Sequence, residues 1–275
     1  MDFVIDISCP SKHNRNMNRM DTARRAQVVR CLIEGCSINS TVRMAGAMVN
    51  LSCERLQADE IWSFVGCKQK NVTAEKVERD GTCGDVWTCT AIDADTKLIP
   101  CFMVGQRDPA VARDFMEDLA GRLSNRVQLT TDGLKVYLNA VKNAFGSDID
   151  YAMLIKVYGN AEEGHKRYSP AVCLGCERKA IEGNPDSDHI STSYVERANL
   201  TMRMNMRRFT RLTNGFSKKV ENHTAQIAIF MMMYNFGRKH MTLGTTPAVK
   251  AGIADHIWSI EEIIGLLERR EQKAA

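Results

Sequence analysis

The sequence contains no hydrophobic run long enough to cross a membrane. Its most apolar stretch, Ile227 to Tyr234, is eight residues long, whereas a membrane-spanning helix needs about 20 apolar residues. The segment Met1 to Arg19 also lacks the apolar core of a signal peptide. We therefore expect no membrane partner and a cytoplasmic location for the chain.

The cysteine patterns of a zinc finger or a disulfide framework are also missing. The ten cysteines are irregularly spaced, and the one Cys-x-x-Cys pair is Cys173 and Cys176. This pair has no second cysteine pair or histidine pair at the spacing of a zinc finger. We interpret the two residues as ordinary thiols in a turn, and the cysteines as reduced.

A large excess of charge of one sign is absent as well. The chain has 37 basic and 33 acidic residues and a net charge of +4, which neither requires nor excludes a nucleic-acid partner. The distribution of charge is more informative, because one stretch contains five arginines and no acidic residue. This basic stretch is either a solvated face or a track for DNA phosphates. Its arginines are Arg197, Arg203, Arg207, Arg208 and Arg211.

The N-terminal region predicts two short helices. One covers Ala23 to Glu34 and the second covers Ile38 to Ala45, with capping residues before each. Two such helices are typical of the first half of a helix-turn-helix, but Ala47 to Leu56 is too short for a recognition helix and a linker. We interpret residues 21–50 as a truncated helix-turn-helix that follows a poorly structured segment, residues 1–20.

From Leu56 onward the pattern predicts strands and helices of an α/β fold. Three strands come first, and helices and strands then alternate, in the order β-β-β-α-β-α-β. This order is typical of a ribonuclease H-like fold, in which the first and fourth strands are neighbours at the centre of the sheet. The predicted strands are 56–65, 86–92, 98–104, 127–131 and 151–157, and the predicted helices are 109–123 and 134–145.

Three acidic residues lie at the edges of predicted elements. Asp59 lies in the first strand, Asp132 ends the fourth, and Glu196 begins a later helix. Neighbouring strands are about 4.8 Å apart, so Asp59 and Asp132 could share metal ions. Carboxylates suit Mg²⁺ or Mn²⁺, and two ions about 3.5–4 Å apart can clamp both oxygens of a phosphodiester displacement. The alternative is that each residue is a solvated turn or cap carboxylate.

The helix that carries Glu196 is predicted to be amphipathic. Its apolar side consists of Val195, Ala198, Met202, Met206 and Phe209. Arg203 and Arg207 lie within about 20° of Glu196 on another side if the helix continues past them. We expect the two arginines to hold a DNA phosphate next to the metal ions.

Three more segments complete the interpretation of the C-terminal half. Residues 158–191 are rich in glycine, proline and charge and have little periodicity, so we interpret them as an inserted loop. Val220 to Phe236 predicts a largely buried helix. In the C-terminal helical segment, residues 246–275, Ser259 and Glu262 have the spacing of a capping box.

Several short motifs resemble those of DDE transposases of the insertion-sequence-one type. The most specific is the string Glu-Arg-x-Asn-x-Thr-x-Arg that begins at Glu196. The resemblance extends over roughly residues 23–267. The motifs that carry it are Asp59-Glu60-Ile61-Trp62, Thr131-Asp132-Gly133, Ser193 to Arg211, and Thr246-Pro247-Ala248.

This resemblance implies a ribonuclease H-like catalytic domain over residues 55–245 that binds two Mg²⁺ or Mn²⁺ ions through Asp59, Asp132 and Glu196. Such an enzyme nicks DNA at the ends of its element and joins the freed 3′ hydroxyl to target DNA. The implied partners are element-end and target DNA and further copies of the chain, with no small-molecule substrate. Neighbours in a strand point to opposite faces, so one of Asp59 and Glu60 should point away from the metal site. The resemblance implies that Asp59 is the metal ligand and that Glu60 points away.

Further expectations concern DNA contacts near the catalytic acids. Arg197, Arg203, Arg207 and Arg211 are the expected DNA-binding residues. His189 could assist at the scissile phosphate, but it could also be a structural or solvated group.

Two other functions stay open from the sequence alone. The chain could be an inactive or DNA-binding-impaired remnant of a mobile element, or a ribonuclease H-like nuclease that cuts without strand transfer.

Overall fold

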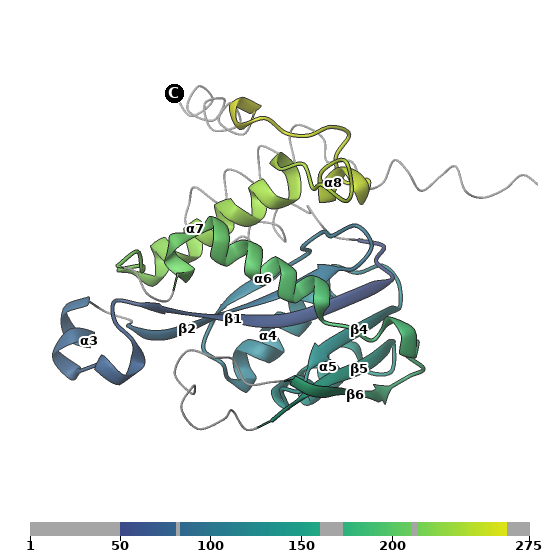
Figure 1. Ribbon diagram of the computed structural model, residues 1–275, viewed down its shortest axis with the longest axis horizontal. Coiled ribbons are helices and arrows are strands. Elements are labelled where there is room, and N and C mark those ends of the chain that lie inside the picture. Colours follow the sequence, from purple (N-terminus) through teal and green to yellow (C-terminus); the bar gives the residue numbers. More distant parts are fainter. Residues whose placement is uncertain (1–49, 81–82, 160–172, 211–213, 263–275) are drawn as a thin grey trace, which may run out of the picture.

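The computed structural model describes residues 50–80, 83–159, 173–210 and 214–262, and these build a six-stranded mixed sheet (Figure 1). The strand order is β3-β2-β1-β4-β5-β6, with the first strand near the centre. The strands are β1 Arg55–Val65, β2 Gly84–Asp93, β3 Phe102–Gly105, β4 Val127–Asp132, β5 Ile149–Tyr158 and β6 Cys173–Glu182.

Strand β1 has different partners on its two edges. It pairs antiparallel with β2 along almost its whole length, from Leu56 to Val65. It pairs parallel with β4 only from Arg55 to Ala58. The predicted adjacency of the first and fourth strands is therefore confirmed, and the ladder between them ends one residue before Asp59.

Helices cover both faces of the sheet (Figure 1). Helices α4 and α5 pack on one face around Phe115 and Tyr137, and α6 and α7 pack on the other around Ile61 and Met202. The α-helices are α3 Ala74–Asp80, α4 Pro109–Ala120, α5 Val136–Phe145, α6 Ser193–Asn205, α7 Val220–Met232 and α8 Pro247–Lys250. Shorter turns are η2 Gln69–Asn71, η3 Ser187–His189, η4 Arg207–Phe209 and the π-helical η5 Met233–Gly237.

The order β-β-β-α-β-α-β is confirmed from β1 to β5, with the short helix α3 added between the first two strands. Hydrophobic periodicity explains this agreement: α4 buries Ala112, Phe115 and Leu119 on one side, and β4 buries Val127 and Leu129. A mixed sheet of this order with helices on both faces is consistent with a ribonuclease H-like fold.

The loop predicted for residues 158–191 is wrong over ten of those residues. Strand β6 lies there and pairs antiparallel with β5. Cys173 and Cys176 both lie in this strand, exposed, and not in a turn. Sequence periodicity could not reveal β6, because nine of its ten side chains are exposed and no apolar alternation is needed.

The predicted continuation of helix α6 to Arg207 is also wrong. The helix ends at Asn205, because Met206 has extended backbone angles, φ −121° and ψ 110°. Arg207 then begins the separate turn η4. Met206 and Phe209 are nevertheless buried in the core beside Ile61, as the apolar pattern predicts. These two side chains can be buried whether the helix continues past Asn205 or ends there, so the apolar pattern alone could not locate the helix end.

The C-terminal part agrees with its local sequence signals. The amide of Ser259 donates to Glu262 Oε2 at 2.9 Å, and the amide of Glu262 donates to Ser259 Oγ at 3.0 Å, so the predicted capping box is confirmed. The predicted helix from Val220 is present as α7 and changes to the π-helical turn η5 at Met233. The prediction that this helix is largely buried is wrong for α7, because only His223, Ile227, Ala228 and Met231 are buried there and Ile229 is 54% exposed. No helix in the described part of the chain is long and apolar enough to cross a membrane.

Some predictions lie outside the described residues. These are the poorly structured segment 1–20, residues 21–49 of the truncated helix-turn-helix, residues 160–172 of the predicted loop, Arg211, and the part of the C-terminal segment after residue 262.

Candidate functional site

The end of the β1–β4 ladder places two acidic side chains together. Ala58 is the last residue of β1 that pairs with β4, opposite Thr131. Asp59 and Asp132 each follow this last pair by one residue. The amide of Leu134 donates to Asp132 Oδ1 at 3.0 Å, which orients that carboxylate at the strand end. The two acids converge as predicted, because parallel pairing brings equivalent positions of β1 and β4 together.

A third carboxylate belongs to the same cluster. Single oxygens of Asp59, Glu60 and Asp132 all lie within 4.8 Å of one another. Asp59 Oδ2 accepts from Asn199 on the α6 side, and Glu60 Oε2 accepts from Tyr137 on the α5 side, so the two side chains do leave opposite faces of β1. The expectation that Glu60 would therefore point away from the cluster is wrong.

Burial and mutual repulsion disfavour the charged forms of the carboxylates in this cluster. Burial, and then the neighbouring charges of Glu60, Asp132 and Glu196, together raise the pKa of Asp59 to about 7. Burial and Asp132 also raise the pKa of Glu60, although its ion pair with Arg107 opposes this shift. Carboxylates crowded in this way suit a hard divalent cation, whose charge removes the repulsion. The donor set therefore fits Mg²⁺ or Mn²⁺.

Helix α6 is held beside the cluster by side chains of β1. The amides of Tyr194 and Val195 donate to Gln57 Oε1 at 2.8 and 3.2 Å. Gln57 thus accepts from the first turn of the helix, where backbone N–H groups lack intrahelical partners. One turn further along, Asn199 Nδ2 donates to Asp59 Oδ2 at 2.9 Å. Alternate residues of one strand, Gln57 and Asp59, therefore fix the position of α6.

Glu196 lines the same cleft as Asp59 and Asp132 but lies outside their compact cluster. Its carboxylate forms an ion pair with Lys156 of β5 and accepts a hydrogen bond from Thr192. The side chain is 41% exposed. The cleft has a volume of about 540 Å³ and is lined by Asp59, Arg107, Asp132, Gly133, Leu134, Leu154, Ile155, Lys156, Tyr158 and Glu196.

Two cations line this acidic cleft among the described residues, Arg107 and Lys156. Arg107 Nε donates to Glu60 Oε1 at 2.6 Å, and its guanidinium lies 4.7 Å from the ring centre of Trp87. The sequence interpretation assigned neither cation to the site. No local motif marks them, because Arg107 follows β3 and Lys156 lies near the end of β5, and only the sheet brings them to Asp59.

The predicted DNA-binding arginines occupy different surroundings. Arg197 is exposed on α6, and Arg203 is partly buried on the same helix. Arg207 is exposed in η4, so it does not lie on the helical face of Glu196. None of the three lines the acidic cleft.

His189 lies in the turn η3 with its side chain 45% exposed. Its Nδ1 lies 2.7 Å from Asp186 Oδ2, so the ring is held by a neighbouring residue and does not line the acidic cleft. This arrangement is the one expected of a structural group.

The sequence matches no family model and no curated protein. A solved structure that it resembles is the cryo-EM structure of piggyBac transposase in a synaptic complex with hairpin DNA. The TM-score is 0.30 and the identity 12%, over 78% of this chain and 52% of the piggyBac chain. The chain thus spans about half the length of that transposase, and a likeness of this degree identifies no activity.

Proposed function

We propose that this chain is a transposase of the insertion-sequence-one type with a ribonuclease H-like catalytic domain. The carboxylates of Asp59, Asp132 and Glu196 would bind two Mg²⁺ or Mn²⁺ ions. With these ions the chain would nick DNA at element ends and join the 3′ hydroxyl to target DNA. The observation that carries the proposal is the convergence of Asp59 and Asp132 from neighbouring parallel strands in a cleft that Glu196 also lines.

Each neighbouring side chain has a definite role in this proposal. Bound divalent ions would polarise the scissile phosphate and lower the pKa of an attacking water. Asn199 holds Asp59 through its hydrogen bond, and the amide of Leu134 holds Asp132. Lys156 places a positive charge in the cleft, where it can attract a phosphate of the substrate.

The third metal ligand has two candidates in the structure. Glu60 is already in the compact cluster, but Arg107 and Tyr137 occupy its oxygens. Glu196 is farther out and exposed, and its partner Lys156 can exchange the carboxylate for a substrate phosphate. We assign the ligand role to Glu196, because an exposed carboxylate can reorient at little cost whereas Glu60 is fixed by two partners.

DNA is the partner that this chemistry requires. Arg197, Arg203 and Arg207 would contact its phosphates outside the cleft, Arg211 is a further proposed phosphate contact, and more than one copy of the chain would assemble on the DNA. We assign no small-molecule substrate to the chain and place it in the cytoplasm.

The test is cleavage of duplex DNA by the purified chain with and without Mg²⁺. Asp132→Asn replaces the carboxylate by an amide of the same shape, and we expect it to lower the nicking rate by roughly 100-fold or more. Asp148→Asn is the matched control, because the side chain of Asp148 is 80% exposed and lies outside the cleft. Equal rates for both variants would exclude this metal site.

The same reaction separates the two enzyme classes. Joined target DNA is the product of a transposase, whereas nicks alone are the product of a ribonuclease H-like nuclease that lacks strand transfer.

A further inference from the structure

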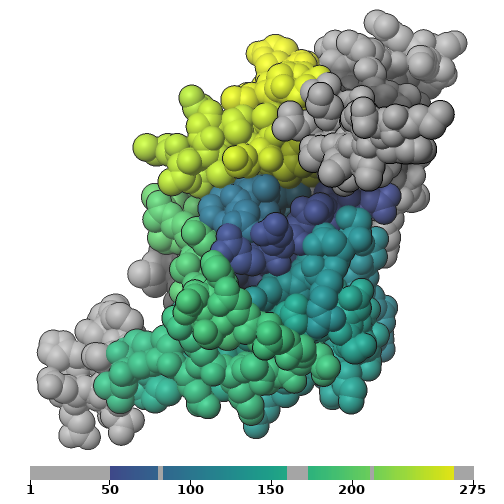
Figure 2. Space-filling model, turned by 90° about the vertical axis from the view of Figure 1, so that its right-hand side faces the viewer, coloured from purple at the N-terminus to yellow at the C-terminus, as the bar shows by residue number. Residues whose placement is uncertain are grey.

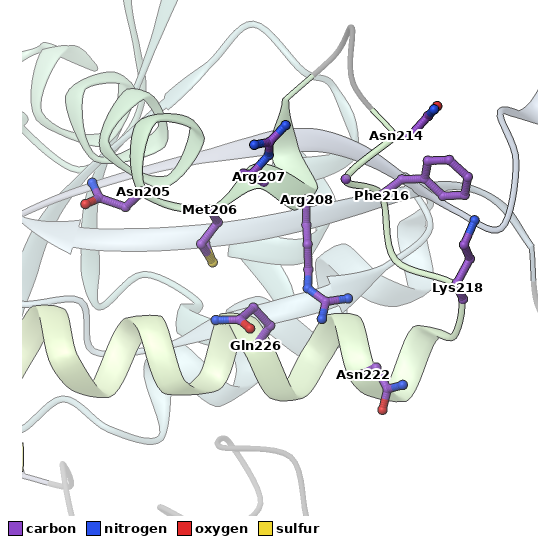
Figure 3. A pocket seen from close by; sticks show the side chains of 10 residues that line it. Asn205, Met206, Arg207, Arg208, Asn214, Phe216, Lys218, Asn222 and Gln226 are labelled. Carbon is purple, nitrogen blue, oxygen red and sulfur yellow. The ribbon is translucent and has the colours of Figure 1, made fainter.

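A second cavity lies between turn η4, the segment that leads into α7, and α7 itself (Figure 3). Its volume is about 500 Å³. In Figure 3 the side chain of Arg208 extends toward α7, where Asn222 and Gln226 lie. The lining residues are Asn205, Met206, Arg207, Arg208, Asn214, Gly215, Phe216, Lys218, Asn222 and Gln226.

The chemistry of the cavity wall fits a polyanion. Three of the described lining residues are cations, Arg207, Arg208 and Lys218, four more carry side-chain amides, and none is acidic. Lys218 Nζ lies 3.8 Å from the ring centre of Phe216, and this ring packs against that of Phe64, with ring centres 4.9 Å apart. Amides and cations without carboxylates are typical of sites that bind phosphate and sugar oxygens.

A buried chain of hydrogen bonds holds Arg208 at this wall. Arg208 Nη1 donates to Ser217 Oγ at 2.8 Å, and Ser217 Oγ lies 2.8 Å from His223 Nδ1. His223 Nε2 lies 3.0 Å from Ser63 Oγ, which donates to the carbonyl of Val86 at 3.1 Å. Ser63, Ser217 and His223 are at most 2% exposed.

One assignment of protons satisfies every link of this chain. Because Ser63 donates to Val86, it must accept from His223 Nε2–H, so Nδ1 accepts from the hydroxyl of Ser217. The oxygen of Ser217 is then available to accept from Arg208. The guanidinium is therefore positioned in advance, which lowers the entropy lost when it binds an anion.

The cavity and the acidic cleft lie along the same edge of β1. Pairing with β4 ends at Ala58, and Ser217 bridges to β1 at Val65, where the amide of Gly66 also donates to the carbonyl of Ser217 at 2.8 Å. Asp59 and Ser63 are four residues apart and so share a face of the strand. At about 3.3 Å per residue their separation along β1 is roughly 13 Å.

We propose that this cavity binds backbone phosphates of the DNA strand that the acidic cleft processes. The inference rests on the proposed function, because it takes DNA as the substrate. Arg208 and Lys218 contact the phosphates, and the amides of Asn222 and Gln226 donate to phosphate or sugar oxygens. A strand cleaved at Asp59 and Asp132 is thus also held farther along β1, which fixes its direction across the sheet.

The experiment measures binding of a random-sequence 30-base-pair duplex at a series of salt concentrations, in EDTA, so that metal ions do not contribute. Lys218→Gln and Arg208→Gln should each weaken binding and reduce the slope of log K against log salt by about one unit. Lys219→Gln is the matched control, since Lys219 is also exposed but does not line the cavity. Its slope should equal that of the wild type.

Lys218→Gln keeps the test decisive if Arg208→Gln does not fold, because Lys218 is an exposed side chain outside the buried hydrogen-bond chain. If Lys218→Gln and Lys219→Gln bind alike while the wild type still binds and nicks DNA, this inference is wrong and the proposed function stands. If the wild-type chain neither binds nor nicks DNA, both are wrong. A smaller slope of log K against log salt in Lys218→Gln and Arg208→Gln, but not in Lys219→Gln, supports the inference.

Discussion

Two glutamates differ in how firmly each is held beside Asp59 and Asp132. Glu60 is buried and bonded to Arg107 and Tyr137, whereas Glu196 is exposed and paired with Lys156. Removing a carboxylate that binds a reactive metal ion lowers the reaction rate strongly. Removing a carboxylate that only contacts neighbouring side chains lowers the rate less. The two residues can therefore be separated by isosteric substitution.

We expect Glu196→Gln to lower the rate of metal-dependent nicking by roughly 100-fold or more, and Glu60→Gln to lower it by no more than about tenfold. The measurement is the nicking rate as a function of Mg²⁺ concentration. A metal ligand also raises the Mg²⁺ concentration needed for half-maximal rate, so this second readout should shift for Glu196→Gln. The reverse order of effects would assign the third ligand to Glu60.

At the scale of elements, the helix pair α6 and α7 joins both candidate sites to β1. Gln57 and Asp59 hold α6, and Ser63 holds α7 through His223. All three strand residues lie on one face, because their numbers differ by two, four or six. The face of β1 that carries the acidic cleft thus also positions the cavity that contains Arg208.

His223 makes the stability of this helix packing depend on pH. Burial, and secondarily the charge of Arg208, lower the pKa of His223 from 6.5 to about 4. The unfolded chain therefore binds a proton at pH values where the folded chain does not. The contribution of His223 to stability is fully present above pH 6.5 and is lost as the pH falls from 6.5 toward 4.

We predict that the unfolding free energy of the wild type falls between pH 6.5 and 4 by up to about 1.4 kcal/mol per pH unit on account of His223. His223→Gln can still donate to Ser63 but does not titrate, so its curve should be flatter over this range. Denaturant unfolding at several pH values measures both. Asn222→Gln on the same helix, which adds no titrating group, should keep the wild-type slope, and equal slopes for all three proteins would contradict the prediction.

At the scale of the whole molecule, the acidic cleft is built from segments far apart in sequence, between Asp59 and Glu196, whereas the lining of the basic cavity lies between Asn205 and Gln226. In Figure 2, C-terminal residues in yellow occupy the upper part of one face, and teal to green residues occupy the lower part, with β1 in purple between them. The chain carries only a small net charge of +4. Under the proposed function, its affinity for DNA would come from local groups of cations that contact phosphates, and phosphates carry no sequence information.

We therefore expect the chain to bind random duplex DNA nearly as tightly as element ends, because the segment 21–50 is interpreted as a truncated helix-turn-helix. Competition between end DNA and random duplex at moderate salt measures this preference. A specific binder prefers its site by about 10³-fold or more. A preference of that size would show that base recognition lies elsewhere in the chain and that the interpretation of residues 21–50 is wrong.

Hydrophobic periodicity and local capping signals, read from the sequence, predicted the strand and helix order from β1 to β5, the adjacency of β1 and β4, and the capping box at Ser259. The element order and the capping box depend on residues near one another in the chain, whereas the adjacency of β1 and β4 was inferred from the ribonuclease H-like arrangement that this order indicates. Asp59 and Asp132 could be paired for the same reason, since parallel strands bring equivalent positions together. The location of Glu196 in the same cleft was predicted from the helix that carries it and from the resemblance, and its role stays a prediction.

Only the tertiary structure decided the rest. Strand β6 has no apolar period because it is exposed on both faces, and the end of α6 is not marked because Met206 and Phe209 are buried on either backbone path. Glu60, Arg107 and Lys156 meet the aspartates through space, across strands and loops that no local pattern connects. A sequence pattern reports which side chains are buried, but only the packing of β1 against its neighbours determines which charges share a site.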